Sequence, residues 1–297
     1  MAPSPVQTVF FLSDYGTQDE FVGVVHAVVV AGAPGASVID LTHHIPPFDV
    51  RAGSHTLMRA VPHLGPGVVL AVVDPGVGDR RRGLCIEVSL PGGGPMFFVG
   101  PDNGLLIAAA ELGAEAPLAH AYELHRRHRP DDLGNTFDGR DLFAPSAAAL
   151  CRGTPPADLG DPVNPDSVVR LFGGVVEQGR LHDGRTCLRA EVTWVDHFGN
   201  IQLAATVVDA RGAGLPSTGS IAVLSSTDGD LGAPEALASA LVPDGIHLRC
   251  VNAFAELAHG ELGLLVDANG HLAVIAGEAS AAHWLNVGAG ELMVLAW

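Results

Sequence analysis

The chain has 297 residues, 47% of them hydrophobic, and its 33 acidic residues against 16 basic ones give a formal net charge of −17. This length fits one large domain or two ordinary domains with a substantial core. The negative charge argues against a nucleic-acid partner, because phosphate binding depends on clustered Lys and Arg. The basic clusters are residues 80–82 and Arg126, Arg127 and Arg129; either is compatible with a solvated turn, and we favour that for the second.

The cysteines and the apolar segments indicate where the protein resides. Four widely spaced cysteines contain no CxxC pair, so we expect neither a zinc site nor a disulfide framework, and a reducing cytoplasm fits them. No signal peptide opens the chain, and the apolar stretch Phe21–Ala33 is too short to span a bilayer. We therefore expect a soluble cytoplasmic protein with no membrane partner. The 14 histidines show no HxxxH or HxH spacing, so we expect no metal site.

Strand-like and helix-like segments alternate in the first half. The predicted elements are strand Thr8–Leu12, helix Glu20–Ala31, strand Ser37–Leu41, helix Val50–Leu64, strand Val68–Val73 and, at the end, helix Arg140–Arg152. Continuous apolar runs suit parallel strands that are covered on both faces. The alternation predicts an α/β domain with a mainly parallel sheet. Ligands of such sheets bind beyond the carboxyl ends of the strands, which directs attention to Ser13-Asp14, Thr42-His43 and Asp74.

The pattern changes after residue 152. Gly153–Ser167 has four prolines and no periodicity, which is typical of a linker. Beyond it come short β-type runs separated by turn residues: Leu188–Val195, Ile201–Ala204, Ile221–Leu224, His247–Val251, Leu262–Val266, Leu272–Ile275 and Leu292–Leu295. We therefore predict an α/β domain over 1–152, a linker over 153–167 and a smaller, all-β, barrel-like domain over 168–297.

The loop after the first strand carries two carboxylates in the segment SDYGTQDEF (13–21). Asp14 stands at the strand end, where a carboxylate can accept the two hydroxyl groups of a ribose. Asp19 can instead be the N-cap of the following helix. No GxGxxG fingerprint of dinucleotide binding is present.

The segment VVDPGVGDRRR (72–82) presents Asp74 on a turn made rigid by proline and glycine. Arg81 lies on the far side of that turn and can fold back onto Asp74. One interpretation is a structural ion pair. The other is a carboxylate and a guanidinium that together position and polarise a water molecule.

Three further motifs each allow a structural and a functional reading. VGPDNGLL (99–106) is a turn that leads into a helix. In NTFDGRDLFAP (135–145), Asp141 can be an N-cap, whereas Asp138 beside a glycine is freer to face a ligand. VDHFGNIQ (195–202) is either a plain hairpin turn or a loop that offers Asp196 and Asn200 to a ligand.

In their order along the chain, these segments resemble the S-adenosyl-L-methionine (SAM) hydroxide adenosyltransferase family, which is related to fluorinase and chlorinase. The resemblance also rests on DLTHHIPPFDVRAG (40–53) and DHFGN (196–200), and it covers nearly the whole chain. It implies an α/β domain, a C-terminal β-barrel and a homotrimer that binds SAM between the first domain of one subunit and the second domain of its neighbour. The implied reaction is hydrolysis of SAM to adenosine and methionine, with no cofactor.

The resemblance also implies roles for individual residues. Asp14 corresponds to the group that holds the ribose hydroxyls, with Asp19 nearby, and Asp74, Arg81 and Asp138 occupy the positions of the water-activating set. The remaining positions implied to bind substrate are Phe48 along the ligand, Thr136 and Phe137 in the TFDGRD motif, Asp196 and Asn200 at the amino-acid end, and Phe254 beside the adenine.

The sequence departs from the family pattern at several of these positions. Asp138 stands where the hydrolases have histidine, which leaves the full water-activating set in question. The usual Ser and Arg contacts of the segment 268–280 are replaced by Ala268, Asn269 and Ala276. Two alternatives therefore remain beside hydrolysis: a chlorinase-like halogenase, and a non-catalytic protein that binds SAM or adenosine. Fluorinase has a tyrosine at the position of Asp74 and a halide-binding serine at that of Gly139, and a carboxylate at 74 would repel a halide.

Overall fold

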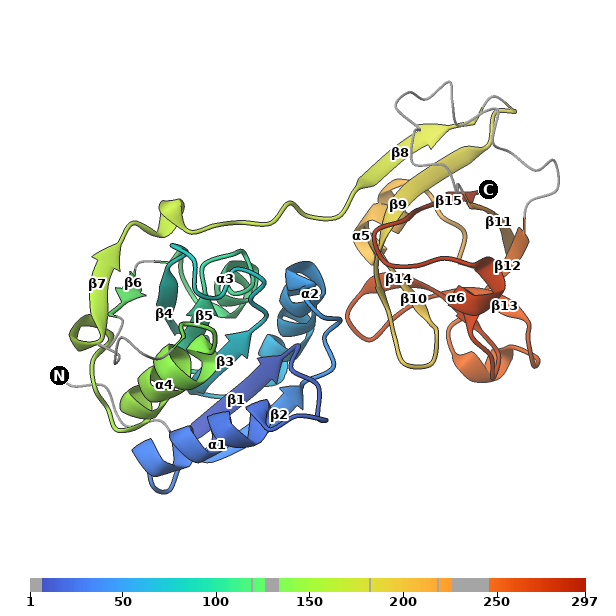
Figure 1. Ribbon diagram of the computed structural model, residues 1–297. Helices are drawn as coiled ribbons and strands as arrows, with labels where there is room; N and C mark the ends of the chain where they lie inside the picture. Colours follow the sequence, from blue (N-terminus) through green and yellow to red (C-terminus); the bar gives the residue numbers. More distant parts are fainter. Residues whose placement is uncertain (1–6, 119, 126–133, 182, 218, 226–245) are drawn as a thin grey trace. The chain divides into compact units, whose positions relative to one another are not determined.

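The computed structural model describes residues 7–118, 120–125, 134–181, 183–217, 219–225 and 246–297. The chain divides into two compact units, Met1–Leu171 and Phe172–Trp297 (Figure 1). The second basic cluster, Arg126, Arg127 and Arg129, lies outside the described residues. Among the described residues, no helix has both the length and the hydropathy that crossing a bilayer requires.

The first unit is built on a seven-stranded sheet with the strand order β2-β1-β3-β5-β4-β6-β7. Its elements are β1 (Thr8–Ser13), α1 (Phe21–Gly32), β2 (Ser37–Thr42), α2 (Val50–Ala60), a 3-10 turn (Val61–His63), β3 (Gly67–Val72), β4 (Gly83–Ser89), β5 (Pro95–Pro101), α3 (Ile107–Gly113), β6 (His120–Leu124), α4 (Ala144–Cys151) and β7 (Gly160–Val163). The elements expected from the sequence in the first 73 residues are all present at closely similar bounds.

The sheet is mixed, which corrects the expectation of a mainly parallel one. β2, β1, β3 and β5 are parallel, whereas β4, β6 and β7 join by antiparallel pairing. For β4 and β5 the cause is the short connection over residues 90–94. Five residues suffice for a hairpin but not for the crossover that a parallel pair requires. Gly93 and Gly94 take positive φ values of 83° and 92° in this turn.

Helices cover both faces of the parallel half of the sheet. On one face, α1 and α4 pack against each other, and on the other α2 contacts α3 (Figure 1). Val9 and Phe11 of β1 join Val25 and Val29 of α1 in one core cluster. The alternate β1 residues are buried as well, and all six residues of β3 are buried. Burial on both faces explains why these strands read as continuous apolar runs.

The expected linker, Gly153–Ser167, contains ordered structure of the first unit. Its residues 160–163 form β7, which pairs with β6 at the edge of the sheet. Just beyond it, the Val169 N–H donates to the buried carboxylate of Asp102 at 2.9 Å. The division between the units falls at Leu171/Phe172, because the chain remains hydrogen-bonded to the first unit up to that region.

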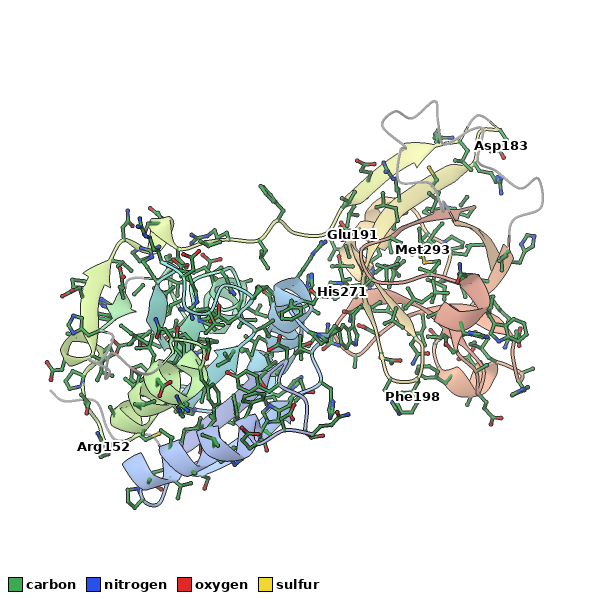
Figure 2. The ribbon with its side chains drawn as sticks, in the orientation of Figure 1. Arg152, Asp183, Glu191, Phe198, His271 and Met293 are labelled. Carbon is green, nitrogen blue, oxygen red and sulfur yellow. The ribbon has the colours of Figure 1, made fainter. Side chains whose placement is uncertain are left out.

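The second unit is a curled, half-barrel β-sheet with the strand order β10-β14-β13-β12-β11-β15-β9-β8, in which β10 also pairs with β9. Its elements are β8 (Val176–Arg180), β9 (Thr186–Val195), β10 (Ile201–Thr206), α5 (Val207–Gly212), β11 (Ser220–Ser225), β12 (Ile246–Cys250), β13 (Leu262–Val266), β14 (His271–Ala276), α6 (Ala281–Leu285) and β15 (Leu292–Ala296). Met293 of β15 belongs to its buried core (Figure 2). The short helices α5 and α6 depart from the expected all-β composition.

Gly100 of β5 tests the packing at the centre of the first sheet. A Cβ at this position would overlap the backbone carbonyl oxygen of Ala71 on the neighbouring chain segment. We expect Gly100→Ala to lower the free energy of unfolding by about 1–3 kcal/mol in urea denaturation, as overpacking does. Gly92→Ala is the matched control, because its Cβ meets open space and its φ is not positive. Equal stability of the two variants would show that the sheet absorbs the overlap.

Candidate active site

Two carboxylates emerge side by side at the carboxyl edge of the parallel strands. β1 and β3 are neighbours in parallel register, with Ser13 opposite Val72. The Asp14 N–H, one residue past β1, donates to the carbonyl of Val72 at 3.4 Å. Asp74 follows β3 by two residues. The strand-end rule therefore places Asp14 and Asp74 at the same edge, as the sequence predicts.

Arg81 binds two carboxylates that are far apart in the chain. Its Nε donates to Asp74 Oδ1 at 2.8 Å, and its Nη2 donates to Asp74 Oδ2, which makes the pair bidentate. The same Nη2 donates to Asp138 Oδ2 at 2.5 Å. The ion pair with Asp74, which the sequence left as one of two readings, is thus present. The Arg81 guanidinium also lies over the ring of Phe143, 5.3 Å from the ring centroid.

This cluster is buried and carries a net negative charge. The side chains of Arg81, Asp74 and Asp138 are 11%, 5% and 2% exposed. Burial by itself lowers the pKa of Arg81, but the hydrogen bonds and charges of Asp74 and Asp138 raise it above its ordinary value. The guanidinium therefore stays charged, and one positive and two negative charges give the cluster a formal charge of −1.

Neighbouring segments fix the turn that carries Asp74 and Arg81. Asn103 Nδ2 donates to the carbonyl of Val73 at 2.8 Å, which holds the backbone immediately before Asp74. Gly78 has a φ of 85°, and a Cβ there would clash with the backbone carbonyl of Asn135. The turn after β3 thus packs closely against the start of the TFDGRD motif, and this contact brings Asp138 within reach of Arg81.

The VGPDNGLL motif and Arg82, the last residue of the basic cluster 80–82, have structural roles. Asp102 accepts from Arg82 Nε at 2.7 Å, and Arg82 Nη2 donates to the carbonyl of Ser167 at 2.7 Å. These bonds tie the segment after β7 to the sheet beside the Asp74 turn. Asp141, considered above as a possible N-cap, instead accepts from Arg140 at 2.8 Å.

Phe48 sits on a strained turn beside Asp14. Its N–H donates to Asp14 Oδ2 at 2.9 Å, and the Asp49 N–H donates to the carbonyl of Pro46 at 3.0 Å. Phe48 is the third residue of this turn and has a φ of 70°, a conformation that favours glycine. The residue is 71% exposed. Strained backbone conformations cluster at ligand sites, so this strained and exposed aromatic residue is a candidate ligand contact.

Three aromatic rings from the segments that carry Asp14 and Asp138 pack against one another. Tyr15, Phe21 and Phe137 lie within 5.2–5.8 Å of one another, measured between ring centroids. A Cβ on Gly139 would overlap the hydroxyl of Tyr15, so the tyrosine fills the space where a side chain at 139 would lie. Burial and the charges of Asp14 and Asp74 raise the pKa of Tyr15, which keeps its O–H available as a hydrogen-bond donor.

These groups line a single cavity of about 250 Å³ in the first unit. Asp14, Phe48, Asp74, Thr136, Phe137 and Asp138 of the predicted residues line it, together with Tyr15, Phe21, Pro47, Val72, Val77 and Gly139. Arg81 does not line the cavity itself but binds the lining residues Asp74 and Asp138. Asp19 is exposed and does not line the cavity, and α1 begins without a capping side chain. The sequence missed Tyr15, although its position next to Asp14 in the motif was the available signal.

The predicted residues of the second unit also line one pocket. Asp196, Asn200 and Phe254 border a cavity of about 730 Å³ together with Phe198, Ala276, Glu278, Ala279 and Ser280. Asp196 is bonded within its own loop, because its Oδ2 accepts from Asn200 Nδ2 at 2.8 Å. The loop joins β9 to β10, and Figure 2 shows the exposed Phe198 on it. The segment thus forms the hairpin turn between β9 and β10, and its Asp196 and Asn200 also border the pocket.

Family models and relatives match almost the full chain. The model of the SAM hydroxide adenosyltransferase N-terminal domain matches residues 9–160, and that of the C-terminal domain matches residues 190–294. The (R)-S-adenosyl-L-methionine hydrolase of Salinispora tropica is 41% identical over 98% of this chain and 97% of its own. A fluorinase of an Actinoplanes species is 25% identical over 94% of both chains. A solved structure of a conserved protein from Thermotoga maritima has a TM-score of 0.78 and 29% identity over 97% of this chain and 99% of its own.

Replacing Arg81 tests whether it holds the buried carboxylates. We expect Arg81→Met to lower the free energy of unfolding by about 3–5 kcal/mol, because two buried carboxylates then lose the cation they share. Arg80→Met is the matched control: this exposed neighbour should change stability by no more than about 0.5 kcal/mol. Urea denaturation at pH 7 measures the stability of both variants. Equal midpoints would show that Arg81 does not stabilise the buried carboxylates.

Proposed function

This chain belongs to the SAM hydroxide adenosyltransferase family, and we propose that it hydrolyses S-adenosyl-L-methionine to adenosine and L-methionine at the cavity of the first unit. The observation that carries the proposal is the buried cluster in which Arg81 binds Asp74 and Asp138 beside that cavity. It supplies a fixed carboxylate that is ready to hold a water molecule, with Asp14 at the adjacent strand end.

The reaction is a displacement at C5′ of SAM. The water oxygen forms a bond to C5′ from the side opposite the sulfonium, the C5′–S bond breaks, and its electron pair leaves with sulfur as the neutral thioether of methionine. The water proton passes to Asp74, which acts as the base or water-holder. Because the sulfonium is already an activated leaving group, the protein mainly orients the reactants and excludes solvent. No metal or cofactor takes part in this scheme.

Arg81 and Asp138 position the base. The bidentate contact fixes both oxygens of Asp74 in direction, so the carboxylate cannot rotate away from the water. Asp138 stands where the resemblance implies histidine, and it accepts from the same guanidinium nitrogen, Nη2, that also binds Asp74. In our scheme, Asp138 therefore acts through Arg81, and the water contacts Asp74.

Charge favours a cationic substrate over an anionic nucleophile. The cluster has a formal charge of −1, and Asp14 adds a further carboxylate to the same cavity. A sulfonium is attracted to this wall, whereas a halide ion is repelled, and both effects are stronger in a partly desolvated site than in water. Water, which is neutral, meets no such barrier. This supports hydrolysis over halogenation.

The remaining substrate contacts come from Asp14, Phe48 and the second unit. Asp14 accepts hydrogen bonds from the ribose hydroxyls, and Phe48 lies along the ligand. Asp196 and Asn200 bind the amino-acid end of SAM and Phe254 the adenine. In this proposal the enzyme is a homotrimer, and those three residues belong to a neighbouring subunit. The open, partly apolar pocket that they share supports the arrangement. The four unpaired cysteines fit the reducing cytoplasm that we propose as the location.

The first prediction concerns the reaction itself and its base. Incubation with SAM should release adenosine and methionine, and Asp74→Asn should slow the release by about 10²–10⁴-fold, since an amide cannot accept the proton. Asp79→Asn is the matched control on the same turn, because its carboxylate is exposed. Chromatography of the adenine-containing products measures the rates. Formation of 5′-chloro-5′-deoxyadenosine with added chloride would indicate a halogenase, and a lack of any product would indicate a binding protein.

The second prediction concerns Asp14 and pH. Asp14→Asn should weaken adenosine binding by about 1.5–3 kcal/mol, the value of one hydrogen bond to a charged group. Burial raises the pKa of Asp14 above 3.8, although the Phe48 N–H bond opposes the shift. The carboxylate therefore gains its proton at a higher pH than usual, and adenosine affinity should fall as pH drops through that pKa. Calorimetry between pH 4 and 7 tests this, and an Asp14→Asn variant with the same pH dependence would contradict it.

The third prediction concerns assembly. If each SAM site needs residues from two chains, activity should require the trimer and should disappear when dilution dissociates it. Light scattering beside the SAM assay measures both. A fully active monomer would refute the shared site and leave hydrolysis itself untouched.

A further inference from the structure

Two histidines and one aspartate converge outside the cavity described above. His26 lies on α1, Asp40 on β2, and His43 just after β2. Asp40 Oδ1 is 2.7 Å from His26 Nε2 and 3.0 Å from His43 Nε2. One ligand atom from each residue lies within 4.8 Å of the others. The sequence pattern did not indicate this group, because its members come from three separate elements.

The inner histidine has a buried nitrogen without an aligned hydrogen bond. His43 is 5% exposed, and its Nε2 has no hydrogen-bond partner of acceptable geometry, although Asp40 Oδ1 is 3.0 Å away. Its Nδ1 is 2.8 Å from Ser13 Oγ. The tautomer decides what this nitrogen can do. With the proton on Nε2, the ring points an N–H at Asp40; with the proton on Nδ1, which then donates to Ser13, the lone pair of Nε2 faces the Asp40 oxygen, and a cation between these two acceptors would relieve their repulsion.

We propose that His26, Asp40 and His43 bind a divalent transition-metal ion, with Zn²⁺ as the reference ion. Two imidazole nitrogens and one carboxylate oxygen are a donor set that such ions prefer. Metal–ligand bonds of about 2.0–2.2 Å separate neighbouring ligand atoms by roughly 3–3.5 Å. The two observed spacings to Asp40 Oδ1, 2.7 and 3.0 Å, therefore need to widen by only about half an ångström. The carboxylate of Asp40 contributes a negative charge, which attracts a cation.

The surroundings of the cluster suit a metal site. The contact between His43 Nδ1 and Ser13 Oγ is of the outer-shell kind that orients a ligand histidine when Nδ1 carries the proton. The ring of Phe11 packs against both imidazoles, with centroids 4.5 Å from His43 and 6.0 Å from His26, and restricts their orientation. On the outer side, the Asp40 and His26 side chains are 42% and 32% exposed, which gives an ion a path of entry and room for water as a fourth ligand.

A bound ion would join α1 to β2 and support the loop that carries Asp14. The carbonyl of His43 accepts from the Gly16 N–H at 2.7 Å, and the Tyr15 N–H donates to Ser13 Oγ at 3.3 Å. The cluster thus contacts the backbone of the SDYG segment, and none of its three members lines the cavity. The ion has a structural role in this proposal and does not touch the substrate.

Titration of the chelator-treated full chain with ZnCl₂ in a calorimeter tests the proposal. We expect one saturable Zn²⁺ per chain, and at least tenfold weaker binding in His26→Ala and in Asp40→Asn. Ser13→Ala, which removes the outer-shell partner, should weaken binding by about 10–100-fold. His44→Ala is the matched control, because this exposed neighbour is outside the cluster and should bind as the native chain does. Substitution with Co²⁺ should add visible absorption bands that disappear in the same variants.

The outcomes are distinct. A lack of saturable binding by the native chain overturns the proposal and leaves a hydrogen-bonded His–Asp–His group. Binding that survives both His26→Ala and Asp40→Asn also overturns it, since the ion then lies elsewhere among the 14 histidines. Circular dichroism confirms that each variant is folded. None of these readouts uses SAM, so the result is independent of the proposed function.

Discussion

The first unit depends on one guanidinium that binds carboxylates from two distant segments. Asp74 ends a buried strand and Asp138 precedes the last helix, yet both bind Arg81. Burying an ion costs several kcal/mol unless a partner compensates it, so none of these three side chains can be buried alone. Their pairing forces the turn after β3 onto the loop before α4, where Gly78 allows the backbones to meet. The same contact closes one wall of the cavity, so stability and the direction of the proposed base have a single origin.

Much of the first unit could be predicted from the sequence because its parallel strands are buried on both faces. Burial there leaves continuous apolar runs, and strand, helix and strand follow one another at the expected lengths. The antiparallel half was missed for a local reason. Whether β4 and β5 run parallel depends on the short connection between them, and its glycines at 93 and 94 were the signal. The range 153–167 resembles a linker because proline is abundant, but Pro162 lies on an edge strand, where a missing N–H is tolerated.

The candidate site was predictable where adjacency in sequence or at a strand end determines position. Asp14 and Asp74 follow neighbouring parallel strands, and Arg81 returns over a short turn, so local rules suffice for these three. Asp138 reaches Arg81 across 57 residues, which only the packing of separate loops determines. Phe48 was expected along the ligand from the resemblance alone. Its positive φ follows from a proline-containing turn and from the bond of its N–H to Asp14, and no propensity for phenylalanine indicates it.

Gly139 and Tyr15 occupy one space between them, and this restricts how the pocket can evolve. Any side chain at 139 would overlap the tyrosine hydroxyl, whereas a smaller residue at 15 would leave a gap beside Phe137. The two positions are therefore epistatic. A side chain at 139 therefore requires Tyr15 to shift or to be replaced by a shorter residue, and a shorter residue at 15 loosens the aromatic wall beside Phe137.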